Sequence, residues 1–483
     1  MDTKPNVVLI LADDMGYGDF GVFNDGYVRT PGLDQFVDES LCLTQHYSAS
    51  PVCSPARAGL LTGRHPLRTG VLGPQEVLGL DRIALDELTL ADGFRSAGYA
   101  TGLVGKWHNG ALDRRFHPNA RGFEEFAGFS GGWADYYDWR LDYNGSTRHS
   151  DGRYVTDVFT EEGLSFIRRH RSEPFLLCMM YSAPHSPLQA PEEVVRPYLD
   201  AGLSPPVAHT YAMIEVMDTG VARLRDELAA LGLADNTIVM FSSDNGPAFE
   251  LRPDQVPEGM SNDATRYNCG YNGAKGSVYE GGIRVPMVIH WPEGGLGGPG
   301  QQRTSDAVVD FTDWFPTLSS LAGIELPDHL PFDGHDRSAT LTGQPSDTEP
   351  RRCWQWNSYT PIAATNAAIR DGDFKLVRPA MTGITYASDH DAELVHRYVQ
   401  LDIDYKYQPE NITRIFTDMV PTMEVPEPPS PELYNLRDDP QESVDLADDD
   451  PSRVTRMLAE LETWFEDVEG ERQQRVLSTG WPG

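Results

Sequence analysis

The sequence predicts an α/β fold with a large, mostly parallel sheet covered by helices on both faces, followed by a smaller C-terminal α+β domain. Three observations predict it. Continuous apolar runs, such as those at 6–12 and 175–180, are typical of parallel strands that are buried on both faces. Segments of helical periodicity separate these runs. Beyond about residue 345 the strand-like runs become short and alternate with turns, which favours a short antiparallel sheet and a terminal helix.

The first apolar run, at 6–12, is followed by two acidic residues, Asp13 and Asp14. A capping pattern at Thr89 and Asp92 begins a helix that Gly98 can end. A later helix repeats its apolar residues at spacings of three and four, from Ile214 to Leu231, and Gly232 closes it. Buried strands are therefore expected at 6–14, 99–108, 174–185 and 236–246, with helices at 90–98, 159–170 and 214–231.

The C-terminal part is expected to contain short antiparallel strands at 367–377 and 432–447 and an amphipathic helix at 454–470. The polar, proline-bearing segment at 342–350 indicates a boundary. The predicted domains are a catalytic domain at 1–345 and a smaller α+β domain at 346–483. The smaller domain carries an insertion at 378–431, which includes a possible helix at 391–407. An insertion of this length is expected to form a rim over a pocket or a subunit contact in a homo-oligomer.

Composition excludes several classes of function. The chain has 483 residues and a net charge of -34, so it offers no basic field for nucleic acid. Its apolar runs are too short to cross a membrane. The five scattered cysteines form neither a disulfide framework nor a C-x-x-C site, which indicates a reducing compartment. The first apolar run lacks a basic leader and a cleavage site, so a cytoplasmic location is expected.

Polar residues follow the predicted strands at the point where each one ends. Ligands of open α/β sheets bind at this edge. Four separate segments therefore predict one functional site, built from Asp13, Asp14, Lys106, His108, His185, Asp244 and Asn245.

The acids indicate a metal site. One Asp-Asp pair alone could equally be a helix cap or a turn. A second oxygen pair, Asp244 and Asn245, ends another strand and favours a metal. Because the set contains only hard oxygen ligands, it favours Ca²⁺ or Mg²⁺ over zinc, and Ca²⁺ before Mg²⁺.

Cys53 has an unusual neighbourhood. A buried cysteine alone is most often a small hydrophobic residue. Here it lies where a loop is expected to enter a helix, with Arg57 one turn further on. A helix N-terminus and an arginine on the same side suit a nucleophile that faces an anion. Lys106, His108, His185 and Lys275 would then be the cations and proton donors around an oxyanion.

The chain resembles the type I sulfatases of the alkaline phosphatase superfamily along nearly its whole length. The nucleophile motif is CSPARAGLLTGR at 53–64. Its companions follow in the family's order: VVLILADDMGYGD, GKWH, PHSP, FSSDNG and GAKGSVYEGGIRVP, with AIRDGDFKLV and ELYNLRDDPQESVDLA in the smaller domain.

The resemblance implies the roles of these residues. A formylglycine-generating enzyme would oxidise Cys53 to formylglycine, whose hydrated form attacks the sulfur of a small-molecule sulfate ester and later expels sulfate. Asp13, Asp14, Asp244, Asn245 and the modified Cys53 would hold one divalent cation. Arg57 would orient the diol, and Lys106 and Lys275 would bind sulfate oxygens. His108 would take a proton from the diol, and His185 would help to protonate the leaving oxygen.

Two other functions remain open on the sequence. A phosphonate or phosphate ester hydrolase of the same superfamily is the first, although Asp244-Asn245 stands where the two-zinc phosphatases have an Asp-His pair. A degenerate sulfatase fold that only binds is the second, but none of the expected functional residues is missing. Aryl, sugar and alkyl sulfates are all possible substrates. The aromatic segment at 128–139 could line a sugar- or aryl-binding rim or could be ordinary loop packing.

Overall fold

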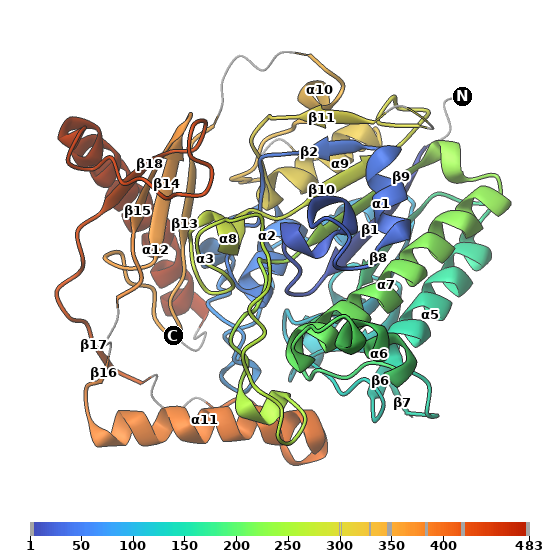
Figure 1. The fold of residues 1–483 in the computed structure, drawn as a ribbon, viewed down its shortest axis with the longest axis horizontal. Coiled ribbons are helices and arrows are strands. Elements are labelled where there is room, and N and C mark those ends of the chain that lie inside the picture. The colour runs from blue at the N-terminus through green and yellow to red at the C-terminus, as the bar shows by residue number, and fades with distance from the viewer. Residues whose placement is uncertain are drawn as a thin grey trace.

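The computed structural model describes residues 4–298, 300, 302–327, 330–344, 350–381, 385–416 and 421–479. A ten-stranded sheet runs through the larger part of the molecule in the order β11-β2-β10-β9-β1-β8-β4-β5-β6-β7 (Figure 1). Its strands are β1 (Asn6–Ala12), β2 (Leu41–Leu43), β4 (Ala100–Lys106), β5 (Glu125–Phe129), β6 (Arg140–Tyr143), β7 (Ser146–His149), β8 (Phe175–Met180), β9 (Thr237–Ser243), β10 (Met287–His290) and β11 (Arg303–Ser305).

The centre of this sheet is parallel. β1 lies between β8 and β9 and pairs in parallel with both, and β4 pairs in parallel with β8 and β5. The antiparallel pairs lie outside this centre, at β10 and along β5, β6 and β7. The predicted α/β class with a mostly parallel large sheet is therefore confirmed.

Strand β1 shows how both faces of the sheet are buried. Val8 and Ile10 belong to one core and Leu9 and Leu11 to another, because successive side chains of a strand point to opposite faces. Helices α1 (Pro31–Asp38), α5 (Val155–His170), α6 (Glu192–Asp200) and α7 (Pro205–Ala230) supply the first core. Helices α2 (Cys53–Thr62), α4 (Leu90–Ser96) and α9 (Trp314–Leu321) supply the second.

The helix signals in the sequence are confirmed locally. Thr89 and Asp92 form a reciprocal capping box at the start of α4. Gly98 and Gly232 follow the ends of α4 and α7 with φ values of +84° and +71°, in the left-handed region that favours glycine. The shorter elements are β3 (His46–Tyr47), β12 (Val309–Asp310), α3 (Pro66–Thr69), α8 (Glu280–Ile283) and α10 (Ser338–Leu341).

A smaller four-stranded antiparallel sheet forms the C-terminal part, as predicted. Its order is β13-β14-β15-β18, and helix α12 packs against it. These elements are β13 (Arg352–Gln355), β14 (Ala367–Asp371), β15 (Phe374–Arg378), β18 (Glu432–Asn435) and α12 (Pro451–Thr479). The exact domain limits of 1–345 and 346–483 stay a prediction.

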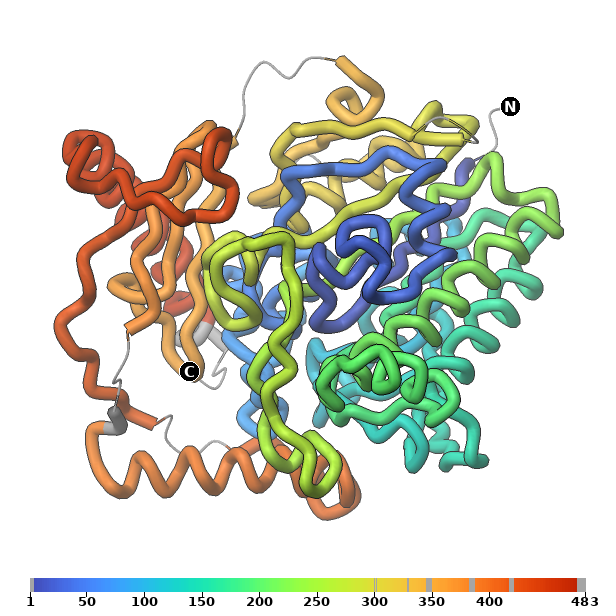
Figure 2. The backbone as a smooth tube through the Cα atoms, viewed as in Figure 1, coloured from blue at the N-terminus to red at the C-terminus, as the bar shows by residue number. Residues whose placement is uncertain are grey.

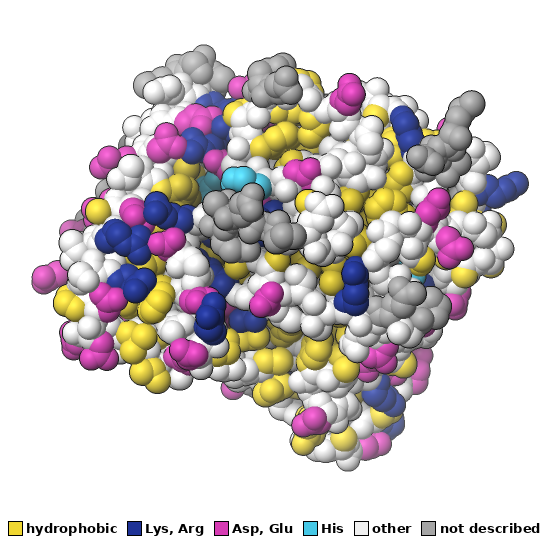
Figure 3. Space-filling model, turned by 90° about the horizontal axis from the view of Figure 1, so that it is seen from above, with side chains coloured by type: hydrophobic (Ala, Val, Ile, Leu, Met, Phe, Trp, Pro, Cys, Tyr) yellow, Lys and Arg dark blue, Asp and Glu magenta, His cyan; other side chains and the backbone are white. Residues whose placement is uncertain are grey.

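The insertion contains the expected helix, α11 (Asp389–Tyr407), and a two-stranded ladder of β16 (Thr385–Tyr386) and β17 (Met423–Glu424). Figure 2 shows α11 as an arm that leaves the smaller sheet and runs beneath the molecule to the yellow-green loop that follows β9. Within the described residues, no helix is long and apolar enough to span a membrane. On the face drawn in Figure 3, acidic and basic side chains are interspersed.

Candidate active site

The predicted site residues meet at one edge of the large sheet. Asp13 and Asp14 follow β1, Lys106 ends β4, His185 lies beyond β8, and Asp244 and Asn245 follow β9. Cys53 is the first residue of α2, and Lys275 comes from the loop ahead of α8. Apart from Lys275, whose side chain is 22% exposed, all of these residues are buried. The structure thus brings every predicted site residue together.

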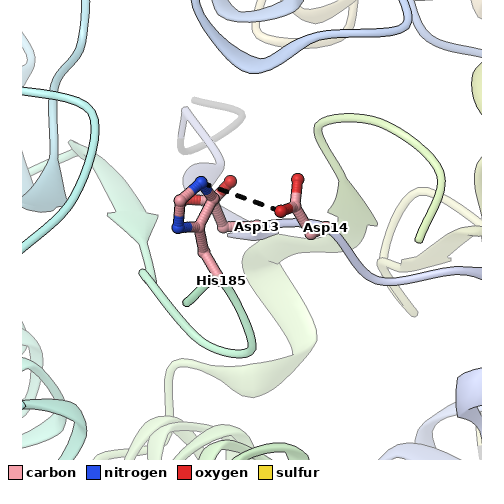
Figure 4. Close-up of side chains that lie close together, drawn as sticks. All are labelled: Asp13, Asp14 and His185. Carbon is pink, nitrogen blue, oxygen red and sulfur yellow. Dashed lines mark ion pairs between the residues drawn. The ribbon is translucent and has the colours of Figure 1, made fainter. Parts of the chain in front are cut away.

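The acids form a compact cluster. The Asp14 backbone N–H donates to Asp244 Oδ1 at 3.3 Å, and Asn245 Nδ2 donates to Asp14 Oδ1 at 2.8 Å. His185 Nε2 lies 3.7 Å from Asp14 Oδ2 (Figure 4). Ligand atoms of Asp13, Asp14 and His185 all lie within 4.8 Å of one another, so His185, expected beside the sulfate, also borders the acids.

Three cations neutralise this cluster. Lys106 Nζ lies 2.6 Å from Asp13 Oδ2, and Lys275 Nζ lies 2.7 Å from Asp14 Oδ1. Arg57 donates from Nε to Asp244 Oδ2 at 2.9 Å and from Nη1 to the Lys106 carbonyl at 3.0 Å. Because unpaired buried charges are costly, the cations and acids depend on one another for burial.

The acid cluster fits a hard divalent cation. Asp13 Oδ1 and Asn245 Oδ1 are buried and accept no hydrogen bond from any residue that the structure describes. Buried polar atoms normally have partners, so two free oxygens in one cluster indicate a ligand. Oxygen donors alone are the set that Ca²⁺ and Mg²⁺ prefer.

Burial sets the protonation of Cys53. It raises the pKa of the thiol, and the opposing effect of Lys106 and Lys275 does not cancel this. The unmodified side chain is therefore a neutral thiol, which is a poor nucleophile because the thiolate is the reactive form. Burial also raises the pKa of Asp244 to about 6, with a further contribution from Asp13.

The two histidines are neutral and each has a fixed tautomer. His108 Nε2 lies 3.1 Å from the Pro74 carbonyl, so Nε2 carries the proton, and Nδ1 has no hydrogen-bond partner among the described residues. His185 Nδ1 lies 2.6 Å from the Ser186 carbonyl, which leaves Nε2 facing Asp14. Burial lowers the pKa of His108 well below its usual value and that of His185 to about 3.

Local backbone strain occurs at two of these residues. Asp14 and His108 have φ values of +68° and +53°, in the left-handed region that side chains other than glycine rarely adopt. Such strain persists only where surrounding contacts fix it, and it concentrates at functional sites. Arg266 is one such contact, because it donates from Nη2 to the Asp14 carbonyl at 3.1 Å while it pairs with buried Asp19.

Sequence reasoning missed several residues that support the site. Glu76 Oε1 lies 3.7 Å from His108 Nε2, and the Tyr136 hydroxyl donates to the His185 carbonyl at 2.8 Å. Arg266 was missed as well. None of these residues lies in a recognisable motif, so no local signal in the sequence could have identified them. Tyr136 lies in the aromatic segment 128–139. For this segment the sequence left two interpretations open, a sugar- or aryl-binding rim and ordinary loop packing.

Comparison with known proteins bears directly on this site. A sequence model described as Sulfatase matches residues 5–324. The chain belongs to the sulfatase family. It is 35% identical over 391 residues to N-acetylgalactosamine-6-sulfatase of Canis lupus familiaris. The aligned region covers 75% of this chain and 70% of that protein. It is 32% identical over 446 residues to steryl-sulfatase of Rattus norvegicus, with 74% of each chain covered.

Solved structures agree with this assignment. This sulfatase superposes on Ps i-CgsB, solved in complex with k-i-k-neocarrahexaose, with a TM-score of 0.76 and 25% identity over 96% of this chain and 93% of the other. The fold is shared with a phosphonate monoester hydrolase from Silicibacter pomeroyi at a TM-score of 0.63 and 18% identity, over 96% of this chain and 95% of that one. The protein is a sulfuric ester hydrolase, as the resemblance predicted, and its substrates are sulfate esters.

Proposed function

We propose that this sulfatase hydrolyses sulfate monoesters with Cys53 converted to formylglycine and with one divalent cation, Ca²⁺ in preference to Mg²⁺. The observation that carries the proposal is that Cys53, the first residue of α2, lies beside a buried oxygen cluster that three cations neutralise. The neutral thiol supports the modification, because an unmodified Cys53 is not activated as a nucleophile. The family's hydrated aldehyde would supply the attacking oxygen in its place.

Asp13, Asp14, Asp244 and Asn245 would hold the cation. When bound, it would supply positive charge beside the nucleophile and the sulfate oxygens. Lys106 and Lys275 now pair with Asp13 and Asp14. A cation on these acids would weaken those pairs and leave both ammonium groups available to sulfate oxygens. Preorganised positive charge of this kind stabilises a transition state in which negative charge spreads over oxygens.

The histidines would handle the protons. His108 carries its proton on Nε2, so its free Nδ1 can accept the proton that the nucleophile must lose. His185 would have the opposite role, since its Nε2 must carry a proton in order to protonate the leaving oxygen. Lys275 is the second cause, after burial, of its lowered pKa. A sulfate anion bound between Lys275 and His185 would oppose that effect and favour the protonated ring.

A phosphonate monoester hydrolase has the same fold, so phosphonate and phosphate esters are the substrates to compare with sulfate esters. Turnover of 4-nitrophenyl sulfate, phosphate and phenylphosphonate esters by one preparation, whose aldehyde content has been measured, determines this preference. We expect the highest kcat/KM with a sulfate ester. A higher value with the phosphonate ester, or no turnover of any sulfate ester by protein that carries the aldehyde, would contradict the proposal.

A further inference from the structure

A cleft of about 890 Å³ lies between the aromatic segment after β5 and the end of α11. Its lining includes the aromatic residues Trp133, Trp139 and Tyr407, and Lys406 of α11 also lines it. The rings of Trp133 and Tyr407 meet edge to face with their centroids 5.5 Å apart. Two segments that are far apart in the sequence, 128–139 and the insertion, thus form one surface.

One wall of this cleft is also a wall of the active site. Gly132 packs so closely on His108 that a Cβ there would lie 2.7 Å from His108 Cε1. Four residues later, Tyr136 donates from its hydroxyl to the His185 carbonyl. Trp133, Ala134 and Asp135, which lie between these two contacts, line the cleft. A molecule in the cleft would therefore lie directly beside the segment that supports both histidines.

The opposite wall is fixed by one buried ion pair and two further polar contacts. Lys406, whose side chain is 4% exposed, pairs with Glu76 Oε1, and the same carboxylate faces His108. Asp402 Oδ1 accepts from the Val77 backbone N–H at 3.3 Å. Just after α11, Glu410 pairs with Arg140 at 2.7 Å. These contacts hold the end of α11 on the catalytic part of the molecule, so the cleft is preformed.

The chemistry of the lining selects its ligand. Tyr407 is 52% exposed and offers an aromatic face beside polar groups, whereas Trp133 is 8% exposed and packs against that ring. Such a surface suits a ligand with both C–H surfaces and hydroxyl groups. Two cationic groups of the lining are neutralised in ion pairs, Arg140 with Glu410 and Lys406 with Glu76. Paired charges leave hydrogen-bonding capacity for hydroxyl groups but little attraction for further anionic groups.

We propose that this cleft binds uncharged units of a saccharide chain next to the sulfated unit, and that Trp133 and Tyr407 determine this specificity. The inference rests on the proposed function and names the leaving group that the same active site would serve.

The test compares a saccharide chain with a small substrate. Tyr407→Ala and Trp133→Ala should each lower kcat/KM for a sulfated galactan hexasaccharide by about tenfold, since one stacking contact contributes energy of that order. Turnover of 4-nitrophenyl sulfate should stay within about twofold, because the chemistry does not use these rings. Tyr27→Ala, which removes a 67% exposed aromatic ring outside the cleft, is the matched control. Equal losses with both substrates, or no loss with either, would overturn the proposal.

Two further measurements test the preference for uncharged units and the binding in the cleft separately. Trp133→Ala could disturb Gly132 and His108, so Tyr407→Ala carries the decision if Trp133→Ala loses activity with both substrates. A chondroitin sulfate hexasaccharide, which carries carboxylates, should be a poorer substrate than the galactan. The reverse order would overturn the proposal that the cleft binds uncharged units.

Binding of desulfated galactan hexasaccharide to the Cys53→Ala protein, followed by tryptophan fluorescence, tests the cleft without turnover. Loss of this binding in Tyr407→Ala supports the cleft even if no sulfate ester is hydrolysed, which would refute only the proposed function. No binding to the parent protein would refute the cleft.

Discussion

Cys53 begins helix α2 with a buried thiol whose pKa is raised. This position would favour an anion through the helix dipole, but burial outweighs that effect for the unmodified side chain. The residue is therefore inactive as a thiol in a place that suits an oxygen nucleophile. The proposed conversion to formylglycine would resolve this contradiction, and it leads to the first prediction.

Specific activity should be proportional to the aldehyde fraction at Cys53, measured by mass spectrometry of the peptide that contains residues 51–57. Cys53→Ala should lose at least about a thousandfold in kcat, because removal of a nucleophile costs this much or more. Cys53→Ser should be severely impaired, since a simple hydroxyl could take up sulfate but could not release it through a carbonyl. Full multiple-turnover activity in protein whose Cys53 is wholly a thiol would refute the mechanism.

The oxygen cluster gives the second prediction. A chelator should remove one divalent ion per chain, abolish turnover and lower Tm, because ligand binding to the folded state stabilises it by about 2.7 kcal/mol at a hundredfold excess over Kd. Calcium should restore both properties better than magnesium. The measurements are elemental analysis and calorimetry with and without the ion.

Asp244→Asn should lose the ion and the activity while it keeps the fold, since an amide still accepts a hydrogen bond from Arg57. Asp244→Ala should be less stable because it removes the partner of that buried guanidinium. Asp200→Asn, at an exposed carboxylate, is the control. Zinc, or two ions per chain, would contradict the single-cation site.

At the scale of elements, His46 links β3 to α9 and to the segment just before β10. Trp314 Nε1 donates to His46 Nε2 at 2.9 Å, and His46 Nδ1 lies 3.2 Å from the Val285 carbonyl. Both contacts require a neutral ring with its proton on Nδ1. Burial accordingly lowers the pKa of His46 to about 3.

This predicts a loss of stability in acid. An unfolded chain binds a proton at His46 near pH 6.5, whereas the folded chain binds it only near pH 3. Its contribution to the free energy of unfolding is therefore complete above pH 6.5 and decreases as the pH falls, by up to about 1.4 kcal/mol per pH unit. Urea denaturation between pH 7 and pH 4 measures it.

His46→Gln should reduce this acid dependence, because glutamine can make both hydrogen bonds without titrating. His390→Gln, at an exposed position, should leave it unchanged. A His46 ring that titrates near pH 6.5 in the folded protein, followed by NMR, would disprove the prediction.

At the scale of the whole molecule, a buried ion cluster joins the smaller sheet to helix α8 and strand β3 of the larger part. Lys375 on β15 is fully buried and lies 2.8 Å from both Glu280 on α8 and Glu442. Glu280 also accepts from the Tyr47 hydroxyl at 2.7 Å. α12 adds a second link, because Glu471 pairs with Arg64 at 2.6 Å. The smaller sheet is therefore expected to unfold together with the larger one.

Lys375→Met should lower the free energy of unfolding by about 3–5 kcal/mol, because it removes the cation that two buried carboxylates share. Arg437→Met is the matched control. It breaks an exposed ion pair with Asp373, and such pairs contribute about 0–1 kcal/mol. Denaturant unfolding should show one transition in the parent protein. A small loss in Lys375→Met, or separate transitions for the two parts, would contradict this account.

The sequence by itself determined the class of the large sheet, the helix caps and the set of residues at the strand ends. These signals are local: a buried strand needs an apolar run, a cap needs a side-chain oxygen, and the ends of parallel strands meet at one edge whatever the rest of the chain does. The sequence also identified α11 as a helix, but not what it contacts.

Only the tertiary structure decided which distant groups meet. Glu76 next to His108, Tyr136 beneath His185, and Tyr407 of α11 against Trp133 have no signal in the sequence, because the residues of each contact come from separate segments. The protonation states of Cys53, His108 and His185 could not be predicted from the sequence either. It depends on how deeply the folded chain buries each group and on which charges it brings close, and neither is a property of the neighbouring residues in the chain.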